Sequence, residues 1–543
     1  MGAVSGRVVP APRRRLRTAA ALTLLIVVPL VPGVISTGSA LRLVGIPVES
    51  LVILLLLAVV PWRPGRVALA AAFGTFVCVA VVLAAVDRGY DVALGTRFVP
   101  LDWPQLGDAY GVLAAAIGPL PASALVGAAL AVLVAAACAL AWAALRIDAV
   151  GAGHSHRRHR ALAAVTGVWI VLAAAAIPLG ATGPVAAAAS TGSVGAAVSR
   201  TVTALHDREA VARAIADDRY ADAAPGGLVR ALRGKDVVIA FIESYGRVAL
   251  EGGGFSSGVN DTLRRGESAL AAEGYVAESA WLTSPTSGGV SWLAHATLQS
   301  GVWIDSQTAY TEVMRSDRLT LSAAFAEAGW RTVGVVPSNT QPWPVGQDFY
   351  RFDEIWDATD LGYRGPPFGY ARVPDQYVWK HFADHELAGS AQPVMAEVDL
   401  VSSHTPWAPL PELVPWGHVG DGSVYHAQRS RSASAGEVWE DAETVQRHYG
   451  RSIEYALGST LAFLENVDDR DLVLIALGDH QPAPIVTGEG AGRDVPVSII
   501  AKDPAVLEAI AGWEWTPGLR PGTTSPVWGM DAFRDRLFSA FRE

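Results

Sequence analysis

The sequence is poor in cysteine and lysine. Its 543 residues include two cysteines, Cys78 and Cys138, and both lie inside long apolar runs. A disulfide framework, a cysteine-based zinc site and a soluble thiol nucleophile are therefore excluded. The only lysines are Lys235, Lys380 and Lys502, and the formal net charge is -10. Because a surface that binds nucleic acid needs an excess of basic residues, we also exclude a nucleic-acid partner.

Apolar residues, by contrast, are abundant. They make up 51% of the chain, charged residues make up 17%, and the mean hydropathy is +0.29, which is too apolar for a single soluble globule. We predict a transmembrane domain over residues 1–184, because a helix of about 20 apolar residues crosses a bilayer. Five spans are expected, near 18–37, 43–62, 67–86, 120–145 and 161–183.

The distribution of arginine predicts the orientation of these spans. Arginines cluster before the first span, between the second and third, and between the fourth and fifth, and all three places lie on one side of the membrane: Arg7, Arg13, Arg14, Arg15, Arg17, Arg63, Arg66, Arg146, Arg157, Arg158 and Arg160. The positive-inside rule then places the N-terminus in the cytoplasm and the chain after residue 184 outside the plasma membrane. An alternative is that the first span is a signal peptide cleaved near Gly38-Ser39-Ala40.

The second half of the chain has the pattern of a soluble α/β domain. A juxtamembrane connector is expected over 185–234, broken by Pro225-Gly226-Gly227. From 235 to 543, short β-branched runs alternate with helical segments, which predicts a largely parallel sheet covered on both faces. The expected strands are 236–242, 332–337, 394–401, 471–477 and 495–501, with helices over 319–329, 452–464 and 530–541.

Polar residues able to bind metal or phosphate follow three of these strands. Glu243 follows the first, His404 the third, and Asp479-His480 the fourth. Ligands of open α/β sheets bind at the carboxyl ends of strands. Glu243 alone could be a helix cap and His404 alone could be structural. The Asp479-His480 pair favours a metal, since hard cations bind carboxylate oxygen and borderline cations accept imidazole.

A hydroxyl-rich segment, 283–292, precedes a helix-like stretch. Thr286 or Ser287 could be an N-cap at the start of that helix. The same position suits a nucleophile, because helix-end N–H groups favour an anion and a nearby cation lowers the pKa of a hydroxyl.

Four motifs in this order resemble the lipoteichoic acid synthase branch of the alkaline phosphatase and sulfatase superfamily. They are FIESYG at 241–246, the threonine segment, SSHTPW at 402–407 and LGDHQP at 477–482. The resemblance implies an extracytoplasmic sulfatase-like fold over 235–543 and one divalent cation, manganese in that branch, with magnesium or zinc as alternatives. It also assigns the site residues: Glu243, Thr286, Asp479 and His480 would hold the cation, Thr286 would be the nucleophile, His404 would contact the phosphate, and Trp343 would lie near the substrate.

The expected activity is phosphotransfer on a membrane lipid or an envelope glycan. Attack by an acceptor hydroxyl makes a transferase, whereas attack by water makes a phosphodiesterase or phosphatase, and the residues named leave both open. Sulfate-ester hydrolysis is disfavoured because Ser284-Pro285-Thr286-Ser287 lacks the following Arg of type I sulfatases. A non-catalytic envelope-binding protein is a further alternative, against which the joint presence of Glu243, Thr286, Asp479 and His480 argues. The sequence leaves the oligomeric state open.

Overall fold

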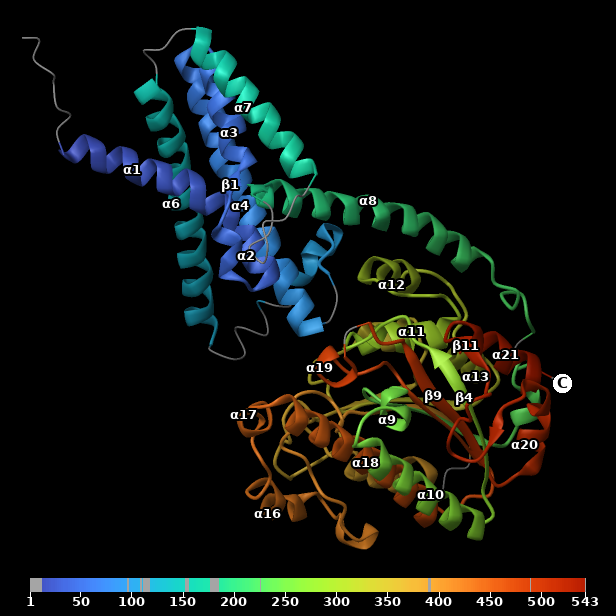
Figure 1. Ribbon diagram of the computed structural model, residues 1–543. Coiled ribbons are helices and arrows are strands. Elements are labelled where there is room, and N and C mark those ends of the chain that lie inside the picture. The colour runs from blue at the N-terminus through green and yellow to red at the C-terminus, as the bar shows by residue number, and fades with distance from the viewer. Residues whose placement is uncertain are drawn as a thin grey trace, which may run out of the picture. The chain divides into compact units, whose positions relative to one another are not determined.

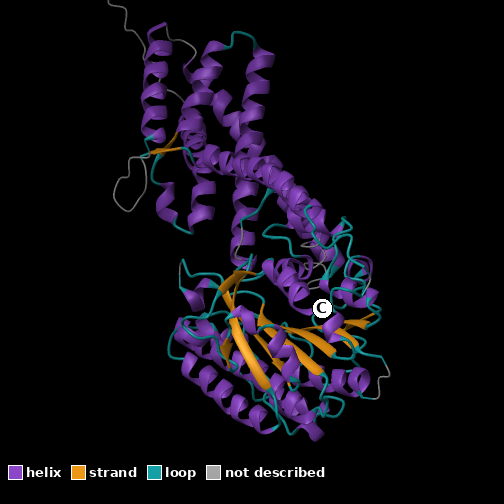
Figure 2. Ribbon diagram, turned by 90° about the vertical axis from the view of Figure 1, so that its right-hand side faces the viewer, coloured by secondary structure: helices purple, strands orange, loops and turns teal. Residues whose placement is uncertain are grey.

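The computed structural model divides into two compact units, one up to His206 and one from Asp207 onward. It describes residues 12–94, 97–107, 110, 118–151, 156–175, 185–224, 226–388, 392–488 and 490–542. The first unit is helical and the second contains the large sheet (Figures 1 and 2).

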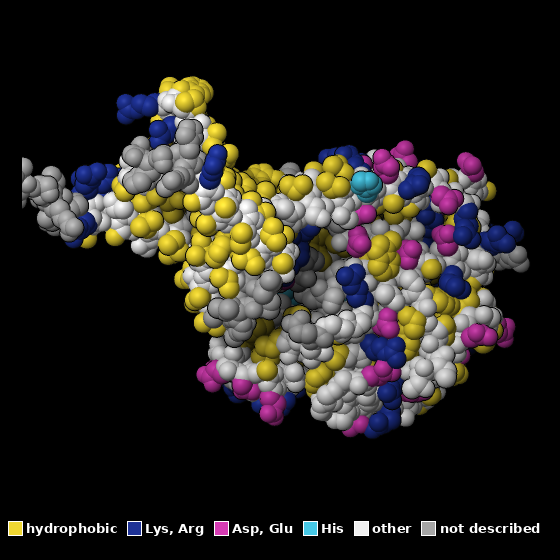
Figure 3. All heavy atoms as spheres, turned by 45° about the horizontal axis from the view of Figure 1, so that its top comes forward, with side chains coloured by type: hydrophobic (Ala, Val, Ile, Leu, Met, Phe, Trp, Pro, Cys, Tyr) yellow, Lys and Arg dark blue, Asp and Glu magenta, His cyan; other side chains and the backbone are white. Residues whose placement is uncertain are grey.

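The N-terminal unit is built from apolar helices. They are α1 (Pro12–Val27) and α2 (Val31–Thr37), joined by a 3-10 turn, then α3 (Val48–Val59), α4 (Arg63–Leu94), α6 (Pro119–Gly151) and α7 (His156–Ala174), followed by α8 (Ala189–Ala216). Large apolar side chains on these helices face outward, among them Leu120 and Val171, and the face seen in Figure 3 is mostly hydrophobic. Such a surface suits lipid contact.

Three of the five predicted spans are long, apolar helices within the described chain: Arg14–Thr37, Arg63–Val92 and Pro119–Val150. The other two are shorter apolar helices, Val48–Val59 and Arg160–Ala174. The helix predicted over 43–62 is confined between Pro47 and Pro61, because proline disfavours a helical residue before it and cannot donate a helix hydrogen bond. The end of the predicted span 161–183 lies outside the described residues.

The second unit holds a nine-stranded sheet in the order β10-β4-β9-β8-β3-β7-β5-β6, with β11 paired to β4. The strands are β3 (Asp236–Ile242), β4 (Val276–Thr283), β5 (Arg331–Val336), β6 (Glu354–Asp357), β7 (Val394–Leu400), β8 (Leu472–Gly478), β9 (Asp494–Ala501), β10 (Thr516–Pro517) and β11 (Val527–Gly529). The five from β8 to β6 are parallel, and β9 runs antiparallel to β8 and β4. All five predicted strands and the largely parallel sheet are confirmed.

Helices cover both faces of this sheet (Figure 1). Alternate residues of β3 enter two separate cores, Val238 and Ala240 in one and Val237 and Ile239 in the other. The first core is closed by α10 (Ser256–Ala272), α15 (Asp375–Phe382) and α18 (Ala442–Asn466), and the second by α11 (Ser291–Ser300), α13 (Leu321–Glu327) and α21 (Ala532–Phe541). Burial on both faces explains the uninterrupted apolar runs of the central strands.

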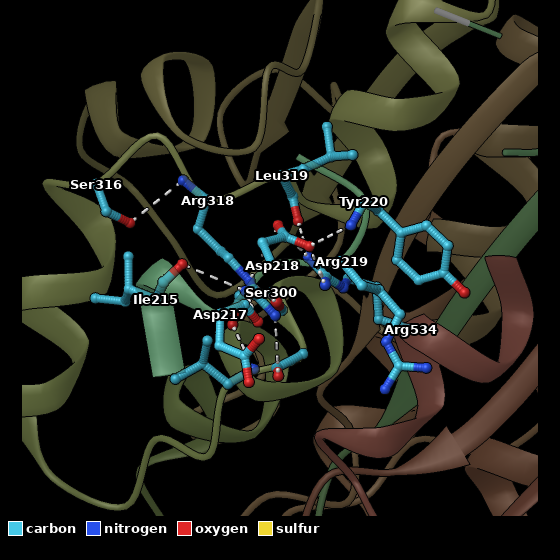
Figure 4. Close-up of polar contacts among 12 residues, drawn as sticks. Ile215, Asp217, Asp218, Arg219, Tyr220, Ser300, Ser316, Arg318, Leu319 and Arg534 are labelled. Atoms are coloured by element: carbon cyan, nitrogen blue, oxygen red, sulfur yellow. Dashed lines mark hydrogen bonds and ion pairs between the residues drawn. The ribbon is translucent and has the colours of Figure 1, made fainter. Parts of the chain in front are cut away.

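A buried arginine pair attaches the end of α8 to this domain (Figure 4). Arg318 donates to the carbonyl oxygens of Ala214 and Asp217, at 3.1 and 3.2 Å, and to that of Ser300 at the end of α11. Arg534 donates to both carboxylate oxygens of Asp218 at 2.9 and 3.1 Å. Since free carbonyls at helix ends need donors, Arg318 caps α8 and α11 together.

Candidate metal and phosphotransfer site

The site lies at the carboxyl ends of β3 and β8. These strands are parallel neighbours, with Ile242 paired to Gly478, so Glu243 and Asp479-His480 emerge side by side. One ligand atom from each of the three residues lies within 4.8 Å of the others, and all three side chains are buried. His480 Nε2 is 3.4 Å from Glu243 Oε1 and 3.5 Å from Asp479 Oδ2.

The donor set fits a divalent cation. His480 Nδ1 faces the Gln481 carbonyl oxygen at 2.8 Å, so Nδ1 is the donor to this oxygen and Nε2 is the nitrogen that would bind a cation. Two carboxylates and one imidazole nitrogen suit manganese, zinc or magnesium. A cation held there would also compensate two buried negative charges.

The pKa values of the two carboxyls are displaced in opposite directions. Burial and the neighbouring Glu243 charge raise the pKa of Asp479. Burial also acts to raise the pKa of Glu243, but the charges of His404 and His480 and hydrogen bonds from Ser244 and Ser291 outweigh it and hold that pKa well below its ordinary value. Such opposed shifts between neighbouring carboxyls are typical of functional sites.

Ser291, which the sequence interpretation did not single out, is the hydroxyl in contact with this group. Its Oγ donates to Glu243 Oε2 at 3.0 Å and lies 3.2 Å from His480 Nε2. Ser291 is the first residue of α11, and Val290 before it has a φ of 59°. Ser244, directly after Glu243, has a φ of 57°. Left-handed backbone at non-glycine residues is concentrated at functional sites.

Thr286 lies in the loop before α11 and not at the helix start where it was expected. Its hydroxyl donates to the Gly289 carbonyl oxygen. The loop is held against the LGDHQP motif, since the Gly288 N–H donates to the Gln481 carbonyl at 2.7 Å and Ser287 bridges Gln481. The helix begins only at Ser291, because Gly288 and Gly289 extend the loop, and this was the signal that could have moved attention to Ser291.

His404 and Trp343 occupy different surroundings. The charge of His404 acts on Glu243, and the His404 ring stacks on Tyr370 with centroids 3.8 Å apart. Tyr370 is 53% exposed and is a second residue that sequence reasoning missed. Trp343 packs beside Tyr350, with ring centroids 5.4 Å apart.

A second group of titratable residues lies beside the first. His295 Nδ1 is 3.1 Å from Glu397 Oε1 and 3.4 Å from Asp399 Oδ1, and its ring stacks on Phe241 at 3.8 Å. Burial opposes protonation of this histidine, but the two carboxylates outweigh burial and raise the pKa of His295 to about 9. His295 is therefore the cation of this triplet at neutral pH, whereas burial raises the pKa of Asp399 to about 7.

Fold and site together define a chain with apolar N-terminal helices and an α/β domain carrying a buried carboxylate–histidine group. No protein-family model and no curated protein matches the chain.

Similar solved structures include the lipoteichoic acid synthase LtaP from Listeria monocytogenes, at 14% identity and a TM-score of 0.37 over 56% of this chain and 72% of that one. The Streptococcus pyogenes phosphoglycerol transferase GacH, in complex with sn-glycerol-1-phosphate, is 12% identical, with a TM-score of 0.37 over 63% and 81%. The lipooligosaccharide phosphoethanolamine transferase A (EptA) from Neisseria meningitidis is 13% identical, with a TM-score of 0.45 over 97% and 95%. Similarity at this level concerns the fold alone, and the chemistry of the site rests on its side chains.

Proposed function

We propose that this protein is a membrane-anchored, metal-dependent phosphotransferase acting on phosphate esters of envelope lipids or glycans, with Ser291 as its nucleophile. The observation that carries the proposal is the contact of one helix-start hydroxyl with both Glu243 and His480, at 3.0 and 3.2 Å, inside a buried ligand group. Glu243, Asp479 and His480 would hold one divalent cation, manganese in the first instance. That cation would supply positive charge that lowers the pKa of the serine hydroxyl and offsets charge developing on the phosphoryl oxygens.

The residues act in a defined order. Attack of Ser291 Oγ forms an Oγ–P bond and breaks the P–O bond to the leaving group, which takes up the serine proton. His404 and Tyr370 would contact the phosphoryl oxygens, and Trp343 would border the substrate further out. A second attack on the phosphoserine, by an acceptor hydroxyl, transfers the group and restores Ser291. Attack by water at that stage would give the hydrolase alternative.

The apolar helices support the choice of an envelope substrate. A lipid-borne donor remains within reach of a site tethered at the bilayer, and the positive-inside pattern places this site outside the cell. Thr286, the nucleophile predicted from the resemblance, is the alternative to Ser291 in that role.

The test is turnover of bis(p-nitrophenyl) phosphate by the full chain in detergent, loaded with manganese. We expect Ser291→Ala to lose about 10³-fold or more in kcat while still binding manganese, because the three proposed metal ligands remain. Thr286→Ala and Ser287→Ala are the matched controls and should retain most of the activity. Wild type trapped with this substrate should carry a p-nitrophenyl phosphoryl group on Ser291, detected by peptide mass spectrometry.

Each alternative has its own outcome. Loss of activity in Thr286→Ala, with Ser291→Ala active, would return the nucleophile to Thr286. Added glycerol should divert product to glycerol phosphate esters in a transferase, whereas a hydrolase would release only the free phosphate monoester. A wild type that neither binds manganese nor turns over the diester would favour the envelope-binding alternative.

A further inference from the structure

The loop that carries His404 is held by two consecutive serines. The Ser402 N–H and hydroxyl both donate to Asp375 Oδ1, at 2.9 and 2.8 Å, and the Asp375 N–H donates back to Ser402 Oγ at 3.0 Å. The Ser403 hydroxyl donates to the Glu243 carbonyl oxygen at 2.6 Å. The loop is therefore fixed between the start of α15 on one side and the residue after β3 on the other.

Asp375 is an unusual residue to find in this place. Its side chain is fully buried, and its Oδ2 has no hydrogen-bond partner among the described residues. A buried carboxylate oxygen without a partner is costly, so the fold tolerates Asp375 for a reason other than stability. The first turn of α15 offsets part of this cost, because a helix start favours a negative charge.

Several groups face the Asp375 carboxyl from the surrounding elements. Burial raises its pKa to about 7, hydrogen bonds from Ser402 and Val401 act in the opposite direction, and the Glu243 charge adds to the rise. Among the described residues, the hydroxyls of Tyr425 and Tyr455 also lie near it, and both remain neutral because burial raises their own pKa values.

We infer that Asp375 is a positioning residue for the proposed phosphotransfer. Its ionised carboxylate accepts hydrogen bonds from Ser402 and thereby holds His404 at the proposed metal site. Hydrogen bonds to a charged acceptor are about twice as strong as those to a neutral one. Protonation of Asp375 therefore loosens the Ser402 end of the loop, whereas Ser403 still ties the loop to Glu243. This inference rests on the proposed function, since it gives His404 its substrate role.

The expected consequence is a pH-dependent KM. Below the raised pKa, Asp375 is protonated and the loop is loose. Substrate affinity therefore improves, and KM falls, as the pH rises through about 7. Turnover of bound substrate depends on Ser291 and the metal ligands, so kcat should change much less.

The test compares wild type with Asp375→Asn in the manganese-loaded full chain, with bis(p-nitrophenyl) phosphate between pH 5 and 9. We expect the variant to have a KM about tenfold higher at pH 8, because it lacks one charge-assisted interaction. Its KM should change little across pH 6–8. Asp531→Asn is the matched control, because burial also raises the pKa of Asp531, which likewise lies at the start of a helix but does not contact the His404 loop. Ser402→Ala should reproduce the raised KM.

A second measurement separates failure of this inference from failure of the proposed function. Inorganic phosphate binding, followed by isothermal titration calorimetry, should weaken about tenfold in Asp375→Asn. Weakened phosphate binding without turnover in any variant would keep the positioning role and overturn the proposed phosphotransfer. If Asp375→Asn keeps the KM, the pH profile and the phosphate affinity of the wild type, the positioning role is overturned.

Discussion

At the residue scale, one face of α11 carries two polar side chains, Ser291 and His295, each of which contacts a group of buried titratable residues. Ser291 and His295 are four residues apart on α11, a spacing that places two side chains on the same side of a helix. Ser291 faces Glu243 and His480, whereas His295 faces Glu397 and Asp399. The contacts of His295 with Glu397 and Asp399 thus support the helix that presents the proposed nucleophile.

Replacing the cation of this triplet should be costly. His295→Gln leaves Glu397 and Asp399 buried without positive charge, and we expect a loss of about 3 kcal/mol in the free energy of unfolding at pH 7. Because the folded-state pKa of His295 is raised from 6.5 to about 9, its stabilising effect is fully present below pH 6.5 and disappears as the pH rises through about 9.

The measurement is chemical denaturation of the full chain in detergent, followed by tryptophan fluorescence. His426→Gln, at an exposed position, is the control and should stay within about 0.5 kcal/mol of wild type. A His295→Gln variant as stable as wild type at pH 7 would contradict the charged triplet.

At the element scale, the loops after β3 and β8 meet backbone against backbone. A Cβ on Gly478, the last residue of β8, would lie 1.9 Å from the Tyr245 carbonyl oxygen, and one on Gly246 would lie 2.0 Å from Gln481 Oε1. Only glycine permits this approach, which brings Glu243 beside Asp479. Close packing of two strand ends is therefore part of the construction of the site.

Gly478→Ala should force these strand ends apart. The displaced Asp479 and His480 would no longer converge with Glu243, and we expect manganese affinity to fall about 10- to 100-fold, the range seen when metal-site support is removed. Competition with a metallochromic indicator measures the affinity. Gly436→Ala is the control, because an added Cβ there meets no atom within 4 Å; equal affinities in the two variants would refute the close-approach explanation.

At the scale of the whole molecule, the chain separates into an apolar helical unit and an α/β unit, and α8 continues from one into the other. Within the part of the chain that the structure describes, three helices are long and apolar enough to cross a membrane. The two units differ in composition as their environments require, since lipid-facing helices need apolar surfaces. The orientation in the membrane is a prediction from the arginine pattern.

Cysteine labelling tests this orientation. With Cys78 and Cys138 replaced by alanine, a single cysteine at the exposed Ser257 should react with a membrane-impermeant maleimide in intact cells. A single cysteine at Arg63 should react only after lysis, because the positive-inside rule places it in the cytoplasm. The reverse pattern would invert the topology and contradict an extracytoplasmic site.

The local sequence determined the central strands and the polar residues at their carboxyl ends. Apolar runs such as 236–242 and 471–477 can be buried on both faces only as central parallel strands, so the positions of Glu243, His404, Asp479 and His480 at strand ends could be predicted from sequence. Strands with a weak sequence pattern, such as β4 and β6, could not be predicted from sequence. They form strands because of the neighbours with which they pair, and their own residues do not indicate it.

The tertiary structure alone decided which hydroxyl and which carboxyl join the site. Ser291 meets His480 across 189 residues of sequence, and Asp375 meets Ser402 across 27. Gly288 and Gly289 are a local signal that α11 begins only at Ser291, but the packing of their loop on Gln481 is decided by the fold. Residue type and strand position are local properties, whereas contact between loops is a property of the packed domain. This is why the sequence could place Glu243, Asp479 and His480 at strand ends but could not show that Ser291 contacts Glu243 and His480.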